Sequence, residues 1–193
     1  TDAIHSYEMV AKGEIKPGDR TIPLLPRFHL FGIMTGALAP IYTGATMCMI
    51  SDLKDLAKAM PKYSPHILFV VPEVVKTVMK KIQRKAKSSI FPLSLIVRKG
   101  LGKNLKIVVS GGAPLDSQWV EAYEKAGITL LNGYGITECS PVVTACSLEH
   151  NKPGSVGKIN VTPFSEVKIA DGTVHVRGDI VMKGYLEDDE VFD

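Results

Sequence analysis

Short apolar runs alternate with amphipathic stretches over more than a hundred residues, and this alternation constrains the fold most strongly. The runs predict buried strands over residues 21–25, 46–50, 67–71, 106–110 and 128–132. Helical periodicity between them predicts helices over 31–42, 53–60, 72–87 and 117–126, with Asp52 and Asp116 as N-caps and Gly127 after the last helix. The order indicates an α/β fold with a largely parallel sheet and flanking helices.

The pattern changes after Pro141. Residues 166–170 and 173–177 alternate between apolar and polar side chains, and Asp171-Gly172 between them favours a tight hairpin turn. We therefore expect an α/β portion over 1–160, followed over 161–193 by the start of a small antiparallel β subdomain. The segment 84–103 has no clean period and predicts either a connecting loop or a place where residues are missing from the sequence.

Composition excludes several classes of protein. With 23 Lys and Arg against 20 Asp and Glu, the net charge of +3 is too small to indicate a nucleic-acid partner. The three cysteines have no C-x-x-C spacing, which argues against a disulfide framework and favours a reducing cytoplasm. The apolar run 28–39 is shorter than the ~20 residues that a membrane span needs. Thr1 is not an initiator residue, so we expect a piece of a longer protein.

The segment NGYGITE, residues 132–138, carries the clearest chemical signal. Gly133 and Gly135 flank one aromatic residue, which leaves the Tyr134 ring free to lie against a planar base. The Thr137 hydroxyl could donate to a phosphate oxygen, and the Glu138 carboxylate is a ligand type that Mg²⁺ prefers. One loop could therefore serve base, phosphate and metal, although Glu138 as a solvated loop carboxylate and Thr137 as a helix cap are the structural alternatives.

The segment SGGAPL, residues 110–115, also follows a predicted strand and precedes a helix. Paired Gly111 and Gly112 would let main-chain groups contact a ligand at the carboxyl edge of a parallel sheet, where open α/β folds place their ligands. Taken alone, this segment reads more readily as an ordinary strand-to-helix turn, because short glycine motifs have many false matches.

These two segments occur in order with two others: LPRFHLFG, residues 25–32, and VRGDIVMKGY, residues 176–185. Together they resemble the adenylate-forming superfamily, the AMP-forming acyl-CoA synthetases with their luciferase and carrier-protein adenylation relatives. The resemblance covers nearly the whole chain. Within the superfamily, the chain is most similar to long-chain fatty acid ligases. It implies that a carboxylic acid reacts with ATP to an acyl-adenylate, and that coenzyme A then takes the acyl group.

The resemblance also implies roles for individual residues. Tyr134 would stack on adenine, Thr137 would bind the α-phosphate, and Glu138 would be the Mg²⁺ ligand. His29 would lie beside the acyl and thiol channel, although a lone histidine in an apolar run is more often a core or helix-start residue. The positions that it places around the adenine are Gly111, Gly112, Ala113, Pro114, Asn132, Gly133 and Gly135.

Some family features are expected outside this chain: a phosphate loop before Thr1, and a ribose-binding Asp and a catalytic Lys after Asp193. We therefore expect the chain to be inactive by itself. Thr173 stands where the family usually has Glu. The alternatives to a long-chain fatty acid ligase are an aryl-acid or medium-chain ligase and a nucleotide-binding module that does not catalyse.

Two further features have structural and functional interpretations. Cys139 has no basic partner nearby in the sequence, so a buried thiol is favoured over a reactive one. The helix 72–87 is basic and amphipathic, which could suit a peripheral membrane contact. More commonly such a helix covers its own sheet and leaves its lysines in water.

Overall fold

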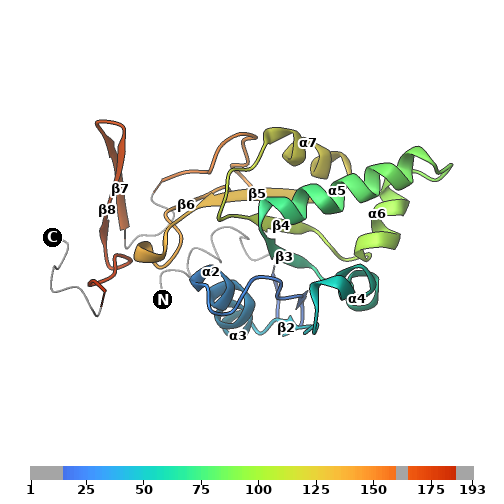
Figure 1. The fold of residues 1–193 in the computed structure, drawn as a ribbon, viewed down its shortest axis with the longest axis horizontal. Coiled ribbons are helices and arrows are strands. Elements are labelled where there is room, and N and C mark those ends of the chain that lie inside the picture. The colour runs from blue at the N-terminus through green and yellow to red at the C-terminus, as the bar shows by residue number, and fades with distance from the viewer. Residues whose placement is uncertain (1–14, 160–164, 186–193) are drawn as a thin grey trace.

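A computed structural model of the chain describes residues 15–159 and 165–185. Its centre is a six-stranded sheet in the order β2-β1-β3-β4-β5-β6 (Figure 1). The neighbouring strands from β2 to β5 are parallel, and β6 is antiparallel to β5. The strands are β1 (Arg20–Thr21), β2 (Thr46–Met47), β3 (Ile67–Val70), β4 (Ile107–Ser110), β5 (Thr129–Tyr134) and β6 (Thr144–Ala145). This confirms the predicted α/β class with a largely parallel sheet.

The central strands are buried on both faces because successive side chains point to opposite sides of a sheet. Leu68, Val70, Val108 and Leu130 join one hydrophobic cluster, whereas the alternate residues Ile67, Phe69, Ile107, Val109 and Leu131 join another. All four residues of β3 and all four of β4 are buried. Two packed cores therefore hold one sheet between them.

Helices cover each face of this sheet (Figure 1). The first cluster contains side chains from α4 (Leu56–Tyr63), α5 (Pro72–Lys87), α6 (Leu93–Leu101) and α7 (Ser117–Lys125). The second includes Phe31 of α2 (Leu30–Ile33) and Ala39 of α3 (Ala39–Thr43). Asp52 and Asp116 accept backbone N–H groups as N-caps of the 3₁₀ turn Leu53–Asp55 and of α7, as their types predict.

The expectation of a connecting loop over 84–103 is wrong for most of that segment. Helix α5 continues to Lys87 and α6 spans Leu93–Leu101, so only residues 88–92 lie between them. Val97 and Leu101, four residues apart, bury one stripe of α6 in the same core as α5. Pro92 occupies the N-cap position of α6 and makes no side-chain cap, so no start signal marks this helix in the sequence, whereas Asp116 marks the equally short α7.

The predicted helix 31–42 is interrupted. Between α2 and α3 lies a π-helical turn, Met34–Leu38, in which the N–H of Ala39 donates to the carbonyl of Met34, five residues earlier. Pro40 has no N–H and its ring crowds the preceding turn of a regular α-helix, so a wider turn accommodates it. Met34 and Thr35 of this turn border the cavity described below.

The two strands predicted after Pro141 form a separate antiparallel hairpin, β7 (Ser165–Ala170) and β8 (Thr173–Gly178). Asp171 and Gly172 connect them with φ angles of 51° and 73°, the left-handed conformation that this residue pair favours. Val167 and Ile180 pack against Cys139 and Val143. The expected subdomain start near Val161 lies outside the described residues.

Tyr123 joins two helices that cover the same face of the sheet. Its side chain is 2% exposed, and its hydroxyl donates to the carbonyl of Val75 in α5 at 3.1 Å. Burial raises the pKa of the Tyr123 phenol far above its ordinary value, so it stays protonated and can act as this donor.

We predict that Tyr123→Phe lowers the free energy of unfolding by about 0.5–1.5 kcal/mol, because the ring stays packed while one buried hydrogen bond is lost. Urea unfolding followed by circular dichroism measures the change. Tyr42, on α3, is 55% exposed, so Tyr42→Phe is the control and should change stability by less than about 0.5 kcal/mol. Equal effects of the two substitutions would show that the hydrogen bond to Val75 does not contribute to stability.

Candidate active site

A cavity of about 360 Å³ opens where the polypeptide leaves the carboxyl ends of β4 and β5. Three segments supply its polar lining: the start of α2, the loop after β4, and the segment from the end of β5 to the 3₁₀ turn Thr137–Cys139. Many of the predicted site residues meet here. Those that line the cavity are His29, Gly111, Gly112, Gly133, Tyr134, Gly135, Thr137 and Glu138.

Parallel pairing explains why the two glycine-rich segments lie together. All four residues of β4 pair with the first four of β5, with Ser110 opposite Asn132 at the end of the shared register. Beyond this pair the chain turns away at Gly111, and β5 ends two residues later at Tyr134, so both segments lie at the carboxyl ends of the strands, where open α/β folds place their ligands. Segments about twenty residues apart thus form one wall of the cavity.

Tyr134 is held through its backbone while its ring remains accessible. Its carbonyl accepts the N–H of Val143 at 3.0 Å, and the residue as a whole is 39% exposed at the end of a strand whose central residues are buried. At Gly135 a Cβ atom would lie 1.6 Å from the carbonyl oxygen of Pro141, so only glycine fits. The tight approach at Gly135 is therefore to the backbone of the following segment, and Tyr134 itself lines the cavity.

Glu138 is fixed by contacts with a distant part of the chain. Its backbone oxygen accepts the N–H of Met182 at 2.8 Å, and its Oε1 accepts the hydroxyl of Tyr185 at 2.6 Å. The Tyr185 hydrogen bond lowers the pKa of the Glu138 carboxyl, so the group is ionised near neutral pH. Tyr185 had no predicted role, because 47 residues separate it from its partner.

The donor set suits a metal ion that arrives with a nucleotide. The described ranges contain no group of three or more His, Cys, Asp or Glu side chains that could hold a metal by themselves. Mg²⁺ needs only one or two protein carboxylates when substrate phosphates supply its other oxygen ligands. A single ionised Glu138 at the cavity fits that mode of binding. It does not fit a structural metal centre, which needs several protein ligands.

Thr137 and His29 occupy two helix starts at the cavity. Thr137 is exposed and is the first residue of its 3₁₀ turn, whose N-cap is Ile136, so Thr137 is not a helix cap. His29 is the N-cap of α2, and its Nδ1 accepts the N–H of Phe31 at 3.2 Å. In the neutral imidazole the proton is then on Nε2, which leaves one donor for another partner. His29 is both a helix-start residue and part of the lining.

The remaining lining is mostly apolar. The Phe31 and Phe69 rings pack edge to face with centroids 6.4 Å apart, and Ala39, Ile67, Val109 and Val142 contribute further aliphatic surface. Within this wall the buried Ser110 hydroxyl has no hydrogen-bond partner among the described residues. The sequence did not predict a separate role for this hydroxyl. The feature that could have indicated it is a serine at the end of an otherwise apolar strand.

Three predicted residues do not line the cavity: Ala113, Pro114 and Asn132. Asn132 is buried, and its Nδ2 donates to the carbonyl of Ser155 at 3.1 Å, which ties the end of β5 to the following loop. A nucleotide contact by these three residues stays a prediction.

Cys139 is 4% exposed, and burial together with the charge of Glu138 raises the pKa of its thiol. This confirms the interpretation as a buried cysteine rather than a reactive one.

Known proteins resemble this chain in sequence. It is 28% identical to a long-chain-fatty-acid–CoA ligase of Mycobacterium bovis over 91% of the chain and 35% of that protein. It is 28% identical to 4-coumarate–CoA ligase 3 of Oryza sativa subsp. japonica and 27% identical to luciferin 4-monooxygenase of Photinus pyralis, over 89% and 96% of the chain and 32% and 34% of those proteins. The chain thus spans about a third of the length of these relatives.

Solved structures share the fold. An anthranilate CoA ligase in complex with anthranoyl-AMP has a TM-score of 0.74 at 20% identity, covering 96% of this chain and 37% of that one. An O-succinylbenzoate coenzyme A synthetase from Bacillus subtilis, in complex with ATP and magnesium ion, has a TM-score of 0.69 at 21% identity, covering 96% and 39%. The AMP-binding enzyme family model matches residues 2–186, and the chain therefore belongs to the AMP-binding enzyme family.

Proposed function

We propose that this chain forms the nucleotide- and acid-binding part of an AMP-forming ligase that joins a carboxylic acid to coenzyme A. The observation that carries the proposal is the composition of one cavity. An accessible aromatic ring, a hydroxyl and an ionised carboxylate, from Tyr134, Thr137 and Glu138, border the same space as an apolar wall. The names of the relatives, which are ligases of fatty and aromatic acids, support this assignment.

The proposed reaction has two steps. A carboxylate oxygen of the acid attacks the α-phosphorus of ATP, a P–O bond forms, and the bond to the leaving pyrophosphate breaks. The sulfur of the coenzyme A thiolate then attacks the acyl carbonyl carbon, a C–S bond forms, and the C–O bond to AMP breaks. Both steps depend mainly on holding charged groups in position around the reacting atoms.

The cavity residues around the nucleotide have separate functions in this scheme. The Tyr134 ring stacks on adenine, with Gly111 and Gly112 leaving room beside the base. The Thr137 hydroxyl donates to an α-phosphate oxygen. Glu138 would hold Mg²⁺, which when bound neutralises phosphate charge, and Tyr185 positions that carboxylate through its hydroxyl.

The acid would occupy the apolar side of the cavity. Phe31, Phe69 and Val109 offer no charged group to a substrate, so an acid with an apolar body is favoured over a polar one. His29 borders the same space and could contact the reacting carboxylate or thiol. The substrate that we propose is a long-chain fatty acid, and an aryl or medium-chain acid is the second candidate. Relatives that act on a long-chain fatty acid and on coumarate both match this chain.

The first prediction about the site tests the ligase assignment. Glu138→Gln should lower the rate of acyl-adenylate formation about 10²- to 10³-fold, because a charge positioned beside the phosphates is lost from a loop without disturbing a core. ATP–pyrophosphate exchange, measured on the product of the open reading frame that encodes this chain, reports the rate. Glu124→Gln on the exposed side of α7 is the matched control and should leave it unchanged.

An unchanged exchange rate in Glu138→Gln at limiting Mg²⁺ would remove Glu138 from the metal site. Absence of exchange in the unsubstituted protein, with every acid tried and with nucleotide still bound, would favour the non-catalytic binding module instead.

The second prediction concerns adenine stacking. Tyr134→Ala should weaken ATP binding by about 0.5–1.5 kcal/mol, whereas Tyr134→Phe, which keeps the aromatic face, should be nearly neutral. Isothermal titration calorimetry compares the two. If Phe is as damaging as Ala, the hydroxyl rather than the ring carries the interaction.

The third prediction concerns substrate class. Burial of each CH₂ group contributes about 0.8 kcal/mol, so kcat/KM should rise steeply with chain length until the acyl chain fills its pocket. A series of saturated acids from acetate to palmitate, with benzoate and coumarate added, measures this dependence. A maximum at an aromatic acid would establish the aryl alternative. A maximum at acetate would exclude both a long-chain fatty acid and an aryl acid as the substrate.

A further inference from the structure

Positive charge is concentrated in one continuous part of the chain. Between Val74 and Leu115 there are ten Lys and Arg residues and no Asp or Glu. Because the whole chain has a net charge of +3, this stretch carries +10 and all other residues together carry −7. The small net charge therefore conceals a strong separation of charge, which creates a local field that the total does not reveal.

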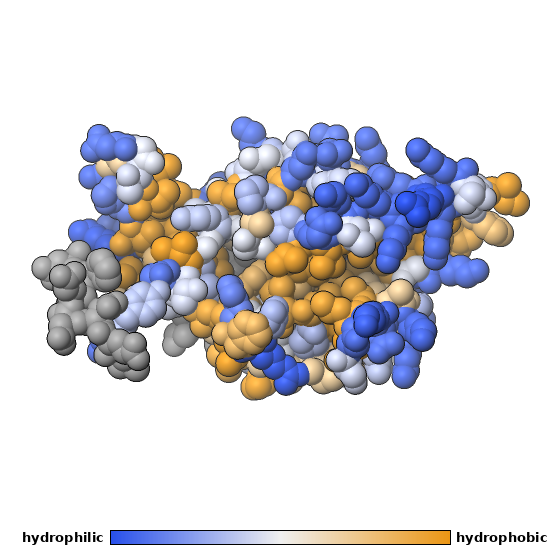
Figure 2. Space-filling view, in the orientation of Figure 1, coloured by the Kyte–Doolittle hydropathy of each residue, from blue (hydrophilic) through white to orange (hydrophobic). Residues whose placement is uncertain are grey.

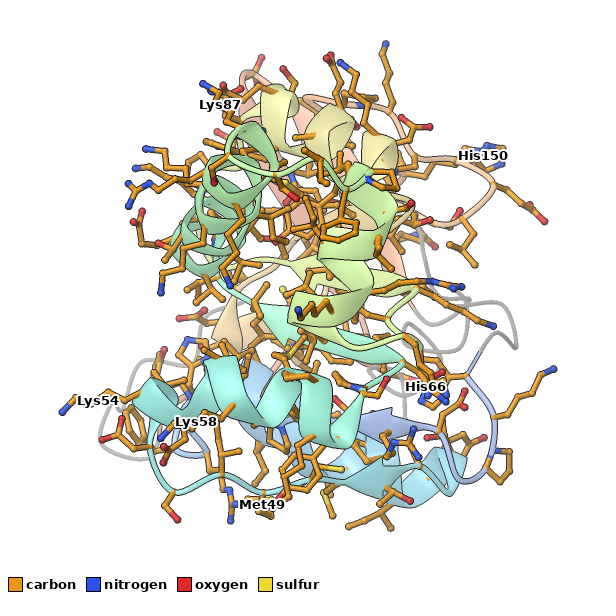
Figure 3. The ribbon with its side chains drawn as sticks, turned by 90° about the vertical axis from the view of Figure 1, so that its right-hand side faces the viewer. Met49, Lys54, Lys58, His66, Lys87 and His150 are labelled. Carbon is orange, nitrogen blue, oxygen red and sulfur yellow. The ribbon has the colours of Figure 1, made fainter. Side chains whose placement is uncertain are left out.

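The cationic stretch lies largely at the end of the molecule away from the cavity. Helix α5 begins directly after the carboxyl end of β3 and runs back along the sheet, so its C-terminus and α6 lie toward the amino ends of the strands (Figure 1). Figure 2 shows hydrophilic surface over α5, and Figure 3 shows Lys87 extending from the end of this helix. Of the ten cationic residues, nine are exposed and only Lys76 is half-buried.

An exposed apolar cluster stands within this basic surface. Ile90 and Phe91, in the loop between α5 and α6, are 97% and 59% exposed, and Leu95 on α6 is 47% exposed. We call these three residues the apolar tip. Figure 2 shows hydrophobic surface at the right end of the molecule, where α5 and α6 meet in Figure 1. Arg84, Lys85 and Lys87 lie in the last turn of α5, immediately before the loop.

The tip differs from the apolar face of α5 itself. Val75, Met79 and Ile82 of α5 are buried in the core, so this helix covers its own sheet and cannot place that face in a membrane. Leu93, Val97 and Leu101 anchor α6 in the same core. The fold therefore holds the apolar tip on two packed helices and leaves Ile90 and Phe91 exposed between them.

A basic recess at the other end of α6 extends the same cationic surface. It has a volume of about 610 Å³, and Arg20, Lys62, Arg98, Lys99 and Lys103 line it. The Arg20 Nε is buried without a hydrogen-bond partner among the described residues. This recess offers several donors to anionic groups at the end of α6 that is farther from the apolar tip.

We propose that the apolar tip and the surrounding cations form a docking surface for an anionic lipid bilayer. Apolar side chains that enter the acyl region and lysines that remain among the headgroups are the two contributions that peripheral membrane binding combines. A nucleic acid would satisfy the cations but would leave Ile90 in water, so lipid accounts for both features. No helix in the ranges 15–159 and 165–185 is long and apolar enough to cross a bilayer.

This orientation leaves the cavity open to water. The tip and the cavity lie toward opposite edges of the parallel sheet, so a bilayer at the tip would not cover Tyr134 or Glu138. Docking would localise the protein at a surface, and the proposal does not depend on the ligase activity proposed above.

The test is co-flotation of the 193-residue chain with lipid vesicles. Binding to vesicles that contain about a third phosphatidylserine should exceed binding to pure phosphatidylcholine at least about tenfold, and should weaken as salt screens the charges. Ile90→Ser with Phe91→Ser should lower the partition coefficient at least about tenfold, because two apolar side chains no longer leave water. Lys85→Gln with Lys87→Gln should lower it about fivefold for each charge removed.

The hairpin supplies a matched control. Ile169 is 69% exposed on β7 beside the exposed Lys168, so Ile169→Ser with Lys168→Gln makes one change of each kind away from the tip and should leave vesicle binding unchanged. All of these positions are exposed, so unfolding midpoints should match the unsubstituted chain. In a Trp119→Phe background, Phe91→Trp should show blue-shifted emission on binding anionic vesicles, which reports insertion directly.

Three outcomes would overturn the proposal. The first is absence of binding to anionic vesicles, and the second is an equal loss in the Ile169/Lys168 control. The third is binding that persists in Ile90→Ser/Phe91→Ser while a single-stranded oligonucleotide competes for it, which would assign the cations to a nucleic acid instead.

Discussion

Parallel pairing between β4 and β5 is the constraint on which the site depends. The register aligns Ser110 with Asn132, so Gly111 and Gly112 after β4 lie beside Gly133 and Tyr134 at the end of β5. The buried side chains of both strands, divided between two clusters, prevent a slip of one residue, because a slip would exchange the two faces. The position of Tyr134 relative to Gly111 thus follows from core packing that involves neither residue directly.

Hydrophobic periodicity predicted most of the fold, because its signal is clearest in the strands and helices that bury the most apolar side chains. Strands 67–71 and 106–110 and helix 72–87 appear within one residue of their expected bounds, since each buries a regular set of apolar side chains. In place of the expected strands 21–25 and 46–50, the structure has two-residue strands, with β2 at the edge of the sheet and β1 next to it. Edge pairing depends on neighbours that a local pattern does not contain, and the same applies to α6, whose stripe is defined only by its core.

The site was predictable where its residues are close in sequence and unpredictable where they are not. The segment NGYGITE placed Gly133, Tyr134, Thr137 and Glu138 at one cavity because a single strand end positions all four. The contact between Glu138 and Tyr185 spans 47 residues and requires the hairpin to return to the sheet, which no local spacing encodes. The unpaired Ser110 hydroxyl emerges only when the apolar residues around it are known.

The Glu138 carboxylate links the two parts of the structure. The 3₁₀ turn that contains Glu138 is held by its next residue, Cys139, which packs with Val143, Val167 and Ile180. Its backbone and side chain are both held by residues that follow β8, through Met182 and Tyr185. A shift of the hairpin would therefore move the carboxylate relative to Tyr134, whose position depends on β5 and Val143. The geometry between the base-stacking ring and the metal-binding carboxylate is thus set by packing of the hairpin against the sheet as much as by the loop that carries both residues.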